Sequence, residues 1–211
     1  MRNKHTAYVI AVAVAIALLV GFGSTTSARR SVPTSSNKSF KDYPDHTFNA
    51  KEYIQGMRKG ARNVLIWQDP SVNLSKYRSV HITDFGGQLL PAQNRFSYDP
   101  FVGSFNANFQ GSLKLHKENS PDALRIEGAV VECNPGSRGA RMWVGFGAGR
   151  AAGAVVCEIY EPDKSEPCMR IYVRDTASGG NYGGNSLSML NHIFFSVAHR
   201  LSKMLEFTIG H

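Results

Sequence analysis

The chain has 211 residues, of which 42% are hydrophobic, so it can bury the core of one medium-sized domain without disulfide staples. Its formal net charge is +8, but no basic run is interleaved with aromatic residues and no finger spacing occurs, which argues against nucleic acid as a partner. The three cysteines form no CxxC pair, which argues against a thiolate metal site.

The first residues have the layout of a secretory signal. A basic start precedes an apolar run over residues 8–22, and small residues ending at Ala28 supply a cleavage site. We therefore expect a signal peptide over residues 1–28 and a secreted or periplasmic mature protein. The alternative is an uncleaved anchor that tethers the protein to a membrane through residues 8–22, although that run is short for a span, which needs ~20 residues.

The next segment, residues 29–48, is rich in Ser, Thr, Asn, Lys and Pro and predicts a flexible linker, which leaves residues 49–211 as a single domain. Asn49 can cap a short helix that reaches Arg62. The apolar run over residues 64–67 then predicts an extended segment.

A strand followed by a helix is predicted in the middle of the chain. Val80 and Ile82 alternate with polar residues, which is typical of a strand, here over residues 77–85. A helix then begins at Asp99, which we expect to be its N-cap, with Pro100 in the first turn. Its apolar residues recur at four-residue spacing and predict a buried face: Phe101, Phe105, Phe109 and Leu113.

Three more strands and a long helix follow. Residues 123–133 alternate as a strand does, residues 141–160 form one strand or two joined by a bulge, and residues 168–174 are the hairpin partner. Asn185 or Ser186 caps the final helix. Its apolar positions recur every three or four residues: Leu187, Leu190, Phe194, Val197, Leu201 and Leu205.

This order, β-α-β-β-β-α, predicts an α+β fold. We expect a two-layer sandwich in which a mostly antiparallel sheet of about four strands carries the helices on one face. The two strands joined by the first long helix should lie parallel, and the others should pair as hairpins.

Two cysteines, Cys157 and Cys168, flank the turn of the last hairpin and are a candidate disulfide in an oxidising compartment. A turn centred between Pro162 and Asp163 would place them opposite each other. The alternation of the apolar side chains instead places the two cysteines on different faces of the hairpin.

The glycine-rich segment between residues 136 and 150 is the most distinctive part of the chain. Gly145, Gly147 and Gly149 occur at every second position, so on a strand they leave one face without side chains. We favour a packing role beneath the last helix, with Gly136 as a further structural glycine in the preceding turn. A dinucleotide fingerprint is rejected, because the segment leads into a strand and not into a helix.

The rival interpretation of this segment is a contact with an anion or a partner. It would use exposed backbone N–H groups and three candidate contact residues, Arg138, Arg141 and Arg150.

No motif in the sequence predicts catalytic residues, a metal site or a cofactor. His192 and His199 lie on a similar face of the last helix, but two histidines are too few for a catalytic zinc site without a third ligand. The remaining candidates are scattered along the chain: His81, Asp84, Asp99 and Glu132.

The segment with the pattern G-S-R…G-F-G-A-G-R, together with the strand that begins at Tyr77, resembles a bacterial family of unknown function with many predicted envelope lipoproteins. The resemblance covers residues 74–207. It implies an envelope location and a small α+β domain, and it brings no catalytic residues. The leader has Phe22, Gly23 and Ser24 where a lipobox would need a cysteine, so the resemblance does not extend to lipid anchoring.

These observations predict an exported cell-envelope protein without enzymatic activity that acts as a binding or accessory module. Its partner is expected to be an envelope protein or an anionic envelope component, with membrane association through an uncleaved N-terminus as a further route. The alternative is a periplasmic hydrolase that acts on an anionic substrate at the glycine- and arginine-rich turn.

Overall fold

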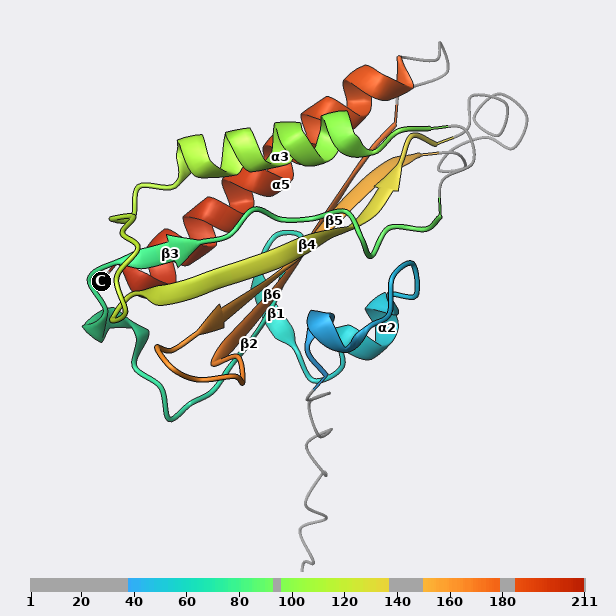
Figure 1. Ribbon diagram of the computed structural model, residues 1–211. Coiled ribbons are helices and arrows are strands. Elements are labelled where there is room, and N and C mark those ends of the chain that lie inside the picture. Colours follow the sequence, from blue (N-terminus) through green and yellow to red (C-terminus); the bar gives the residue numbers. More distant parts are fainter. Residues whose placement is uncertain (1–37, 93–95, 137–149, 179–184, 211) are drawn as a thin grey trace, which may run out of the picture. The chain divides into compact units, whose positions relative to one another are not determined.

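The computed structural model describes residues 38–92, 96–136, 150–178 and 185–210, which form a six-stranded mixed sheet in the order β1-β2-β6-β5-β4-β3 (Figure 1). The strands are β1 (Arg58–Ala61), β2 (Val64–Gln68), β3 (Val80–Ile82), β4 (Leu124–Asn134), β5 (Ala151–Tyr160) and β6 (Met169–Ala177). The helices are α2 (Ala50–Tyr53), α3 (Asp99–Ser112) and α5 (Ser186–Ile209), with two 3-10 turns, η1 (Phe40–Asp42) and η2 (Leu74–Lys76). None of the described helices is long and apolar enough to cross a bilayer.

The sheet confirms the expected α+β class, but it is larger than the expected four strands. The difference arises at β1 and β2, which form an antiparallel hairpin with Lys59 opposite Leu65. We expected one helix from Asn49 to Arg62. The helix α2 is instead short, because Gly56 has a φ of 80° and takes the chain out of the helical region.

The parallel pair in the sheet lies where the sequence predicts it. β3 and β4 are joined by α3 and run parallel, with Val80 opposite Leu124. The start of α3 differs from the prediction, because the N-cap is Tyr98 and not Asp99, and no side chain caps the helix. Pro100 in the first turn has no N–H group, which removes one of the donors that a cap would satisfy.

The hairpin formed by β5 and β6 does not place the two cysteines of the candidate disulfide opposite each other. Cys157 lies opposite Ile171, and not opposite Cys168. Cys168 precedes β6, and its backbone N–H donates to the Ile159 carbonyl at 2.8 Å. No candidate disulfide is formed, since all three cysteines of the chain, Cys133 included, are buried free thiols.

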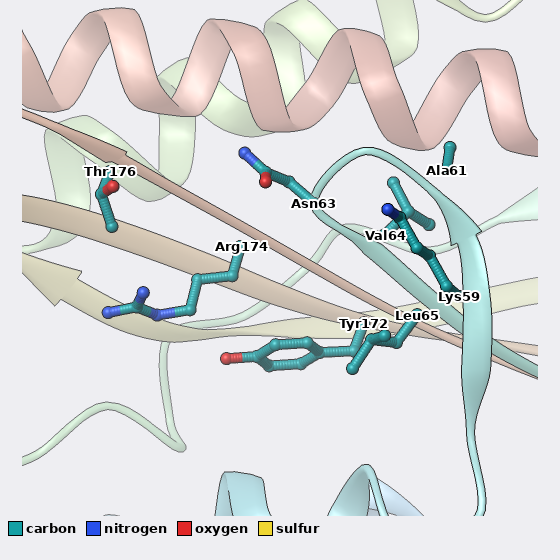
Figure 2. Close-up of a pocket in the computed structure, with 8 residues that line it drawn as sticks. All are labelled: Lys59, Ala61, Asn63, Val64, Leu65, Tyr172, Arg174 and Thr176. Carbon is teal, nitrogen blue, oxygen red and sulfur yellow. The ribbon is translucent and has the colours of Figure 1, made fainter.

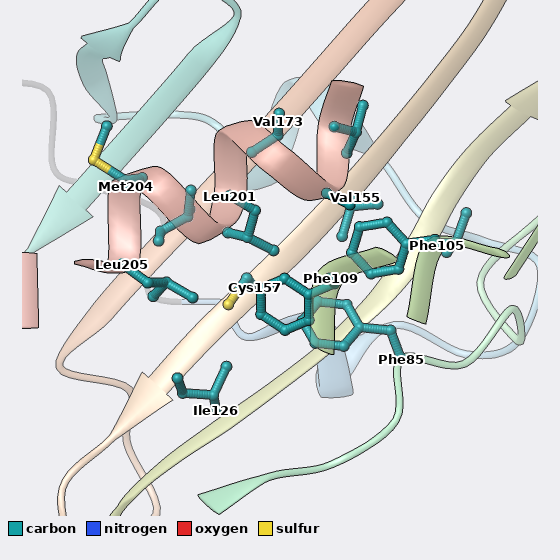
Figure 3. Packing of buried hydrophobic residues seen from close by; sticks show 14 of the residues in the cluster. Phe85, Phe105, Phe109, Ile126, Val155, Cys157, Val173, Leu201, Met204 and Leu205 are labelled. Carbon is teal, nitrogen blue, oxygen red and sulfur yellow. The ribbon is translucent and has the colours of Figure 1, made fainter. Parts of the chain in front are cut away.

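One face of the sheet is covered by α3 and α5, which lie side by side in Figure 1. The predicted aromatic stripe of α3 is buried, and Figure 3 shows its rings packed with Phe85 and with residues of α5 and the strands. Phe85 lies 5.2 Å from Phe105 and 5.3 Å from Phe109, measured between ring centroids. The stripe of α5 is buried from Leu190 onward, whereas Leu187, expected on this stripe, is 47% exposed.

A glycine of β5 lets α5 approach the sheet closely. A Cβ atom on Gly153 would lie 2.8 Å from the Ile193 Cγ2 atom and 3.2 Å from the Phe194 ring. Real side chains essentially never approach so closely, so this position has to lack one. The glycines for which we expected this role, Gly145 to Gly149, lie outside the described residues.

The opposite face of the sheet is covered in part by residues 38–57, so the expectation of helices on one face only was incomplete. A second cluster of buried residues packs there: Phe40, Tyr43, Tyr53, Leu89, Ala129, Val131, Ala154, Val156 and Tyr172. We expected a flexible linker up to residue 48. Its described part, from Lys38, instead packs against the sheet, because Phe40 and Tyr43 are apolar anchors within a polar sequence.

Candidate functional site

A groove of about 320 Å³ lies on this second face, where the β1–β2 hairpin meets β6. Figure 2 shows the residues that line it: Lys59, Ala61, Asn63, Val64, Leu65, Tyr172, Arg174 and Thr176. The strands supply nearly all of the lining, so the groove is held by the sheet and not by a loop. The groove combines a buried aromatic side chain, Tyr172, with two cations, Lys59 and Arg174.

The alternation of β6 explains why these side chains meet. Tyr172, Arg174 and Thr176 occupy every second position and face away from α5. The intervening Val173 belongs to the core beneath the helices. Asn63, at the turn of the β1–β2 hairpin, has a φ of 64°, a left-handed conformation that asparagine tolerates well, and its carbonyl accepts from the Arg174 N–H at 3.1 Å.

The guanidinium of Arg174 is held by a second strand. It donates to both carboxylate oxygens of Glu132 on β4, at 2.7 and 3.0 Å. These hydrogen bonds raise the pKa of Arg174, which therefore stays charged. Ala154 on β5 lies opposite both Arg174 on β6 and Glu132 on β4, and its small side chain leaves room for this bridge. Burial raises the pKa of Tyr172 to about 12, so its hydroxyl stays protonated at neutral pH.

The other cation of the groove, Lys59, makes no ion pair with a described acidic residue. It lies on the exposed strand β1, opposite the half-buried Leu65. The groove also contains the Tyr172 ring, which forms an apolar floor, and the hydroxyl of Thr176, which is a hydrogen-bonding group. The arrangement suits an acidic group attached to an apolar or extended ligand.

A second pocket, of about 420 Å³, lies on the other side of β1, next to the carboxyl-terminal half of α5. Its lining surface is largely apolar and includes Gly60, Met204 and Phe207. Its polar residues are Arg62, His199, Arg200 and Lys203. Arg200 is fixed there by hydrogen bonds to the Arg62 carbonyl and the Ser196 hydroxyl. Strand β1 therefore has a pocket on each of its two sides.

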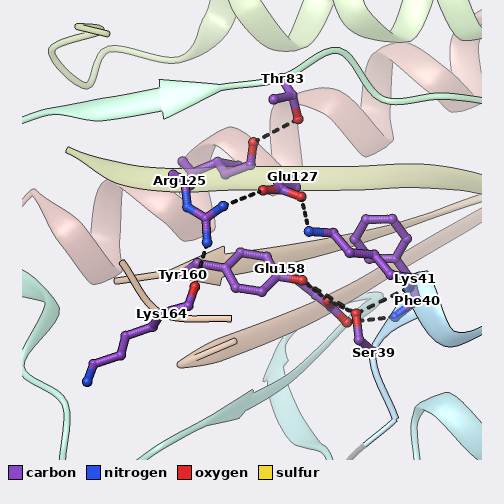
Figure 4. Close-up of polar contacts among 10 residues, drawn as sticks. Ser39, Phe40, Lys41, Thr83, Arg125, Glu127, Glu158, Tyr160 and Lys164 are labelled. Atoms are coloured by element: carbon purple, nitrogen blue, oxygen red, sulfur yellow. Dashed lines mark hydrogen bonds and ion pairs between the residues drawn. The ribbon is translucent and has the colours of Figure 1, made fainter. Parts of the chain in front are cut away.

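The buried charges of the sheet serve a different purpose. Glu158 is fully buried, and its carboxylate accepts four hydrogen bonds, from the hydroxyls of Ser39, Tyr53 and Tyr160 and from the Phe40 N–H. Figure 4 shows Glu158 with Ser39, Phe40 and Tyr160, together with Glu127, which binds Lys41 and Arg125. Most of these donors belong to residues 38–53, so the network attaches this segment to the sheet.

The tyrosines of this network are kept neutral. Burial, with the nearby Glu158 charge as the next cause, raises the pKa of Tyr53 and of Tyr160 far above the ordinary value. Both hydroxyls therefore remain donors to the carboxylate. We assign the network a structural role, because its donors and its acceptor are all used within the fold.

The sequence-predicted contact residues are only partly described. Arg150 is exposed directly before β5, while Arg138 and Arg141 lie outside the described residues, so this contact remains a prediction. Gly136 has a φ of 72°, and its N–H donates to the Asn134 side chain at 2.8 Å, as a turn glycine does. Within the described ranges, no group of three or more His, Cys, Asp or Glu side chains could hold a metal ion.

Sequence reasoning missed Lys59, Tyr172, Arg174 and Thr176. Lys59 was assigned to a helix, although Gly60 and Asn63 nearby are turn signals that would have indicated a hairpin. The alternation of residues 172, 174 and 176 was a usable signal, since it places them together on the face opposite the core. The sequence alone did not predict that β2 pairs with β6.

A family model described as "Domain of unknown function (DUF4410)" matches residues 103–181, which run from α3 to the end of the β5–β6 hairpin. No curated protein matches the chain. The chain is similar to the PelC dodecamer protein from Paraburkholderia phytofirmans, with a TM-score of 0.41 and 13% identity over 67% of this chain and 96% of that one.

Two further solved structures are similar over comparable lengths. A minor lipoprotein from Acinetobacter baumannii has a TM-score of 0.33 and 11% identity, over 64% of this chain and 95% of that one. A DUF4136 family protein from Bacteroides thetaiotaomicron has a TM-score of 0.35 and 9% identity, over 70% and 97%. These likenesses assign no ligand or partner to this chain, and the family match is to a domain of unknown function.

Proposed function

We propose that this chain is an exported cell-envelope protein that acts as a non-enzymatic binding module and holds an anionic partner in the groove between β1 and β6. The observation that carries the proposal is Lys59, a cation without a described ion pair, beside the apolar floor formed by Tyr172. An acidic group of a partner would gain a charge-assisted contact there, while the attached apolar part would cover the floor.

The export part of the proposal is supported by the leader-like residues 1–28. The binding part is supported by the way the groove is built. Tyr172, the floor of the groove, lies on β6, which pairs with β2 on one side and with β5 on the other. The site is therefore preformed and loses little conformational entropy when a ligand binds. The buried network of Glu158 is already satisfied within the fold, whereas Lys59 in the groove is exposed and open to a partner.

The test compares two charge reversals, Lys59→Glu and Lys51→Glu, in a tagged chain that keeps its leader. Both residues are exposed lysines, but Lys51 lies on α2, outside the groove. We expect the wild type and the Lys51→Glu variant to recover the same anionic component from intact envelopes, and the Lys59→Glu variant to lose it. Equal recovery by all three chains would refute the role of the groove.

A further inference from the structure

The open edge of the sheet is β1, and the two edges of the sheet differ. At the other edge, β3 is covered by the segment that follows α3: the Val80 N–H donates to the His116 carbonyl at 2.9 Å, and the Glu118 N–H donates to the Val80 carbonyl at 3.0 Å. Among the described residues, no segment pairs with the outer side of β1, whose four residues are all exposed. Half of the backbone N–H and C=O groups of such an edge point outward and can pair with another strand.

The two faces of β1 differ in chemistry. Lys59 faces the groove with Tyr172, whereas Gly60 faces Ile66 and Met204 and lines the apolar pocket at α5. Successive side chains of an extended chain point to opposite faces. An added strand would therefore point alternate side chains toward the side of Lys59 and toward the side of Gly60 while its backbone pairs with β1.

The charge of the edge selects the occupant. Arg58, Lys59 and Arg62 make no ion pair with a described acidic residue, although the described part of the chain contains many ion pairs elsewhere. An acidic segment would neutralise these cations. A second copy of β1 would instead place like charges opposite one another, which destabilises paired strands.

We propose that β1 accepts an extended acidic segment of a partner protein as a seventh strand, with acidic side chains toward Lys59 and apolar side chains toward Gly60 and Met204. This inference rests on the binding role proposed above and names the chemistry of the partner: a peptide that alternates acidic and apolar residues. The main chain supplies the pairing, and the different surroundings of Lys59 and Gly60 supply the preference for alternation.

The first experiment uses a synthetic probe, a blocked octapeptide of alternating valine and glutamate, and two isomers of it. In one isomer the glutamate nitrogens are N-methylated, and in the other the valine nitrogens are. Because only every second N–H of an added strand points at its neighbour, we expect one isomer to bind like the parent and the other to lose binding up to ~1 mM. Any other pattern, equal binding of both isomers included, overturns the inference.

The second readout locates the contact. We expect the probe to slow hydrogen exchange at the amides of residues 58–61, and protection confined to another part of the chain would refute strand addition at β1. The Lys59→Glu variant should bind the probe about fivefold more weakly, and the Lys51→Glu variant should bind it like the wild type. A lysine-for-glutamate version of the probe should show the reverse order, with the Lys59→Glu variant binding better.

The two proposals can fail separately. If the methylated isomers bind alike but Lys59→Glu still loses the envelope component, the groove binds an anionic partner by another route, and strand addition is wrong. If the isomers differ as expected but all chains recover the same envelope component, β1 accepts a strand, and the proposed anionic partner of the groove is wrong.

Discussion

Glu158 on β5 lies directly opposite Arg170 on β6, and the two side chains are 0% and 1% exposed. Arg170 donates to the Lys38 carbonyl at 3.2 Å and lies over the Trp67 ring, 4.7 Å from its centroid. Both charges thus take partners from residues outside their own hairpin. They join the amino-terminal segment to the centre of the sheet, at a position where an apolar pair would bury equally well but bind no polar groups.

The first prediction concerns this pair. Glu158→Ala removes the acceptor of four hydrogen bonds and leaves Arg170 with less compensation for its buried charge, so we expect the free energy of unfolding to fall by ~3 kcal/mol in urea titrations. Glu166→Ala, in the exposed turn after β5, should change it by less than ~0.5 kcal/mol. Equal midpoints for the two variants would show that the network contributes nothing.

The second prediction uses two glycines in opposite environments. Gly153→Val should destabilise the fold by ~1–3 kcal/mol, because the new side chain collides with Ile193 and Phe194 of α5. Gly103 lies on the exposed side of α3, where an added Cβ atom would meet nothing within 4 Å. Gly103→Ala should therefore stabilise the fold by ~0.5–1 kcal/mol. Thermal unfolding of both variants checks the pair. A Gly153→Val variant that melts like the wild type would mean that α5 does not rest on β5 as described.

A third prediction addresses the thiols. Burial raises the pKa of Cys133 to about 12 and that of Cys168 to about 11, and it also raises the pKa of Cys157. Because the thiolate is the reactive form, we expect a thiol reagent at pH 8 to leave the native protein unmodified and to label three cysteines in urea without reductant. Labelling of a single cysteine in urea would reveal a disulfide between the other two.

The same shifts predict how stability depends on pH. In the folded state Cys133, Cys168 and Tyr172 hold their protons to a pH of about 11 to 12, whereas the unfolded chain releases them near the ordinary values of 9.0 and 10.0. The folded protein then binds more protons, so stability falls as the pH rises through this window and is unaffected by these groups below about pH 8. Urea midpoints between pH 8 and pH 11 measure the slope. A Cys133→Ala and Cys168→Ala double variant should show a shallower one, and an unchanged slope would assign the effect to other groups.

A fifth prediction follows from the leader. If the chain is exported through a cleaved signal, the mature protein should begin at Arg29, which N-terminal sequencing of the protein from the envelope fraction would show. A start at Met1 in membrane fractions would favour the tether over residues 8–22 instead.

Local sequence patterns predicted the helices and strands in which buried residues recur at regular intervals. The aromatic stripe of α3 and the apolar stripe of α5 have one buried face each, and the strand–helix–strand order of β3, α3 and β4 permits little besides a parallel pair. These elements are therefore readable from the chain alone.

The remaining features depend on contacts between distant residues. Phe40 and Tyr43 lie in a polar segment that resembles a linker until the sheet supplies a surface for them. Lys59 lies in a segment whose apolar spacing predicts a helix, but Gly56 turns the chain before Lys59 is reached. Tyr172, which lines the same groove, belongs to the last strand. The groove is thus assembled by the pairing of β2 with β6, which no local pattern specifies.

The place of β6 between β2 and β5 also has a kinetic consequence. The β1–β2 hairpin can form early, but its neighbour in the sheet is the last strand to be synthesised, and contacts of such long sequence separation fold slowly. A nascent chain would remain incompletely folded until its end has left the ribosome. If the protein is exported as proposed, such a delay would keep the polypeptide able to pass through a translocation channel before it adopts its native form.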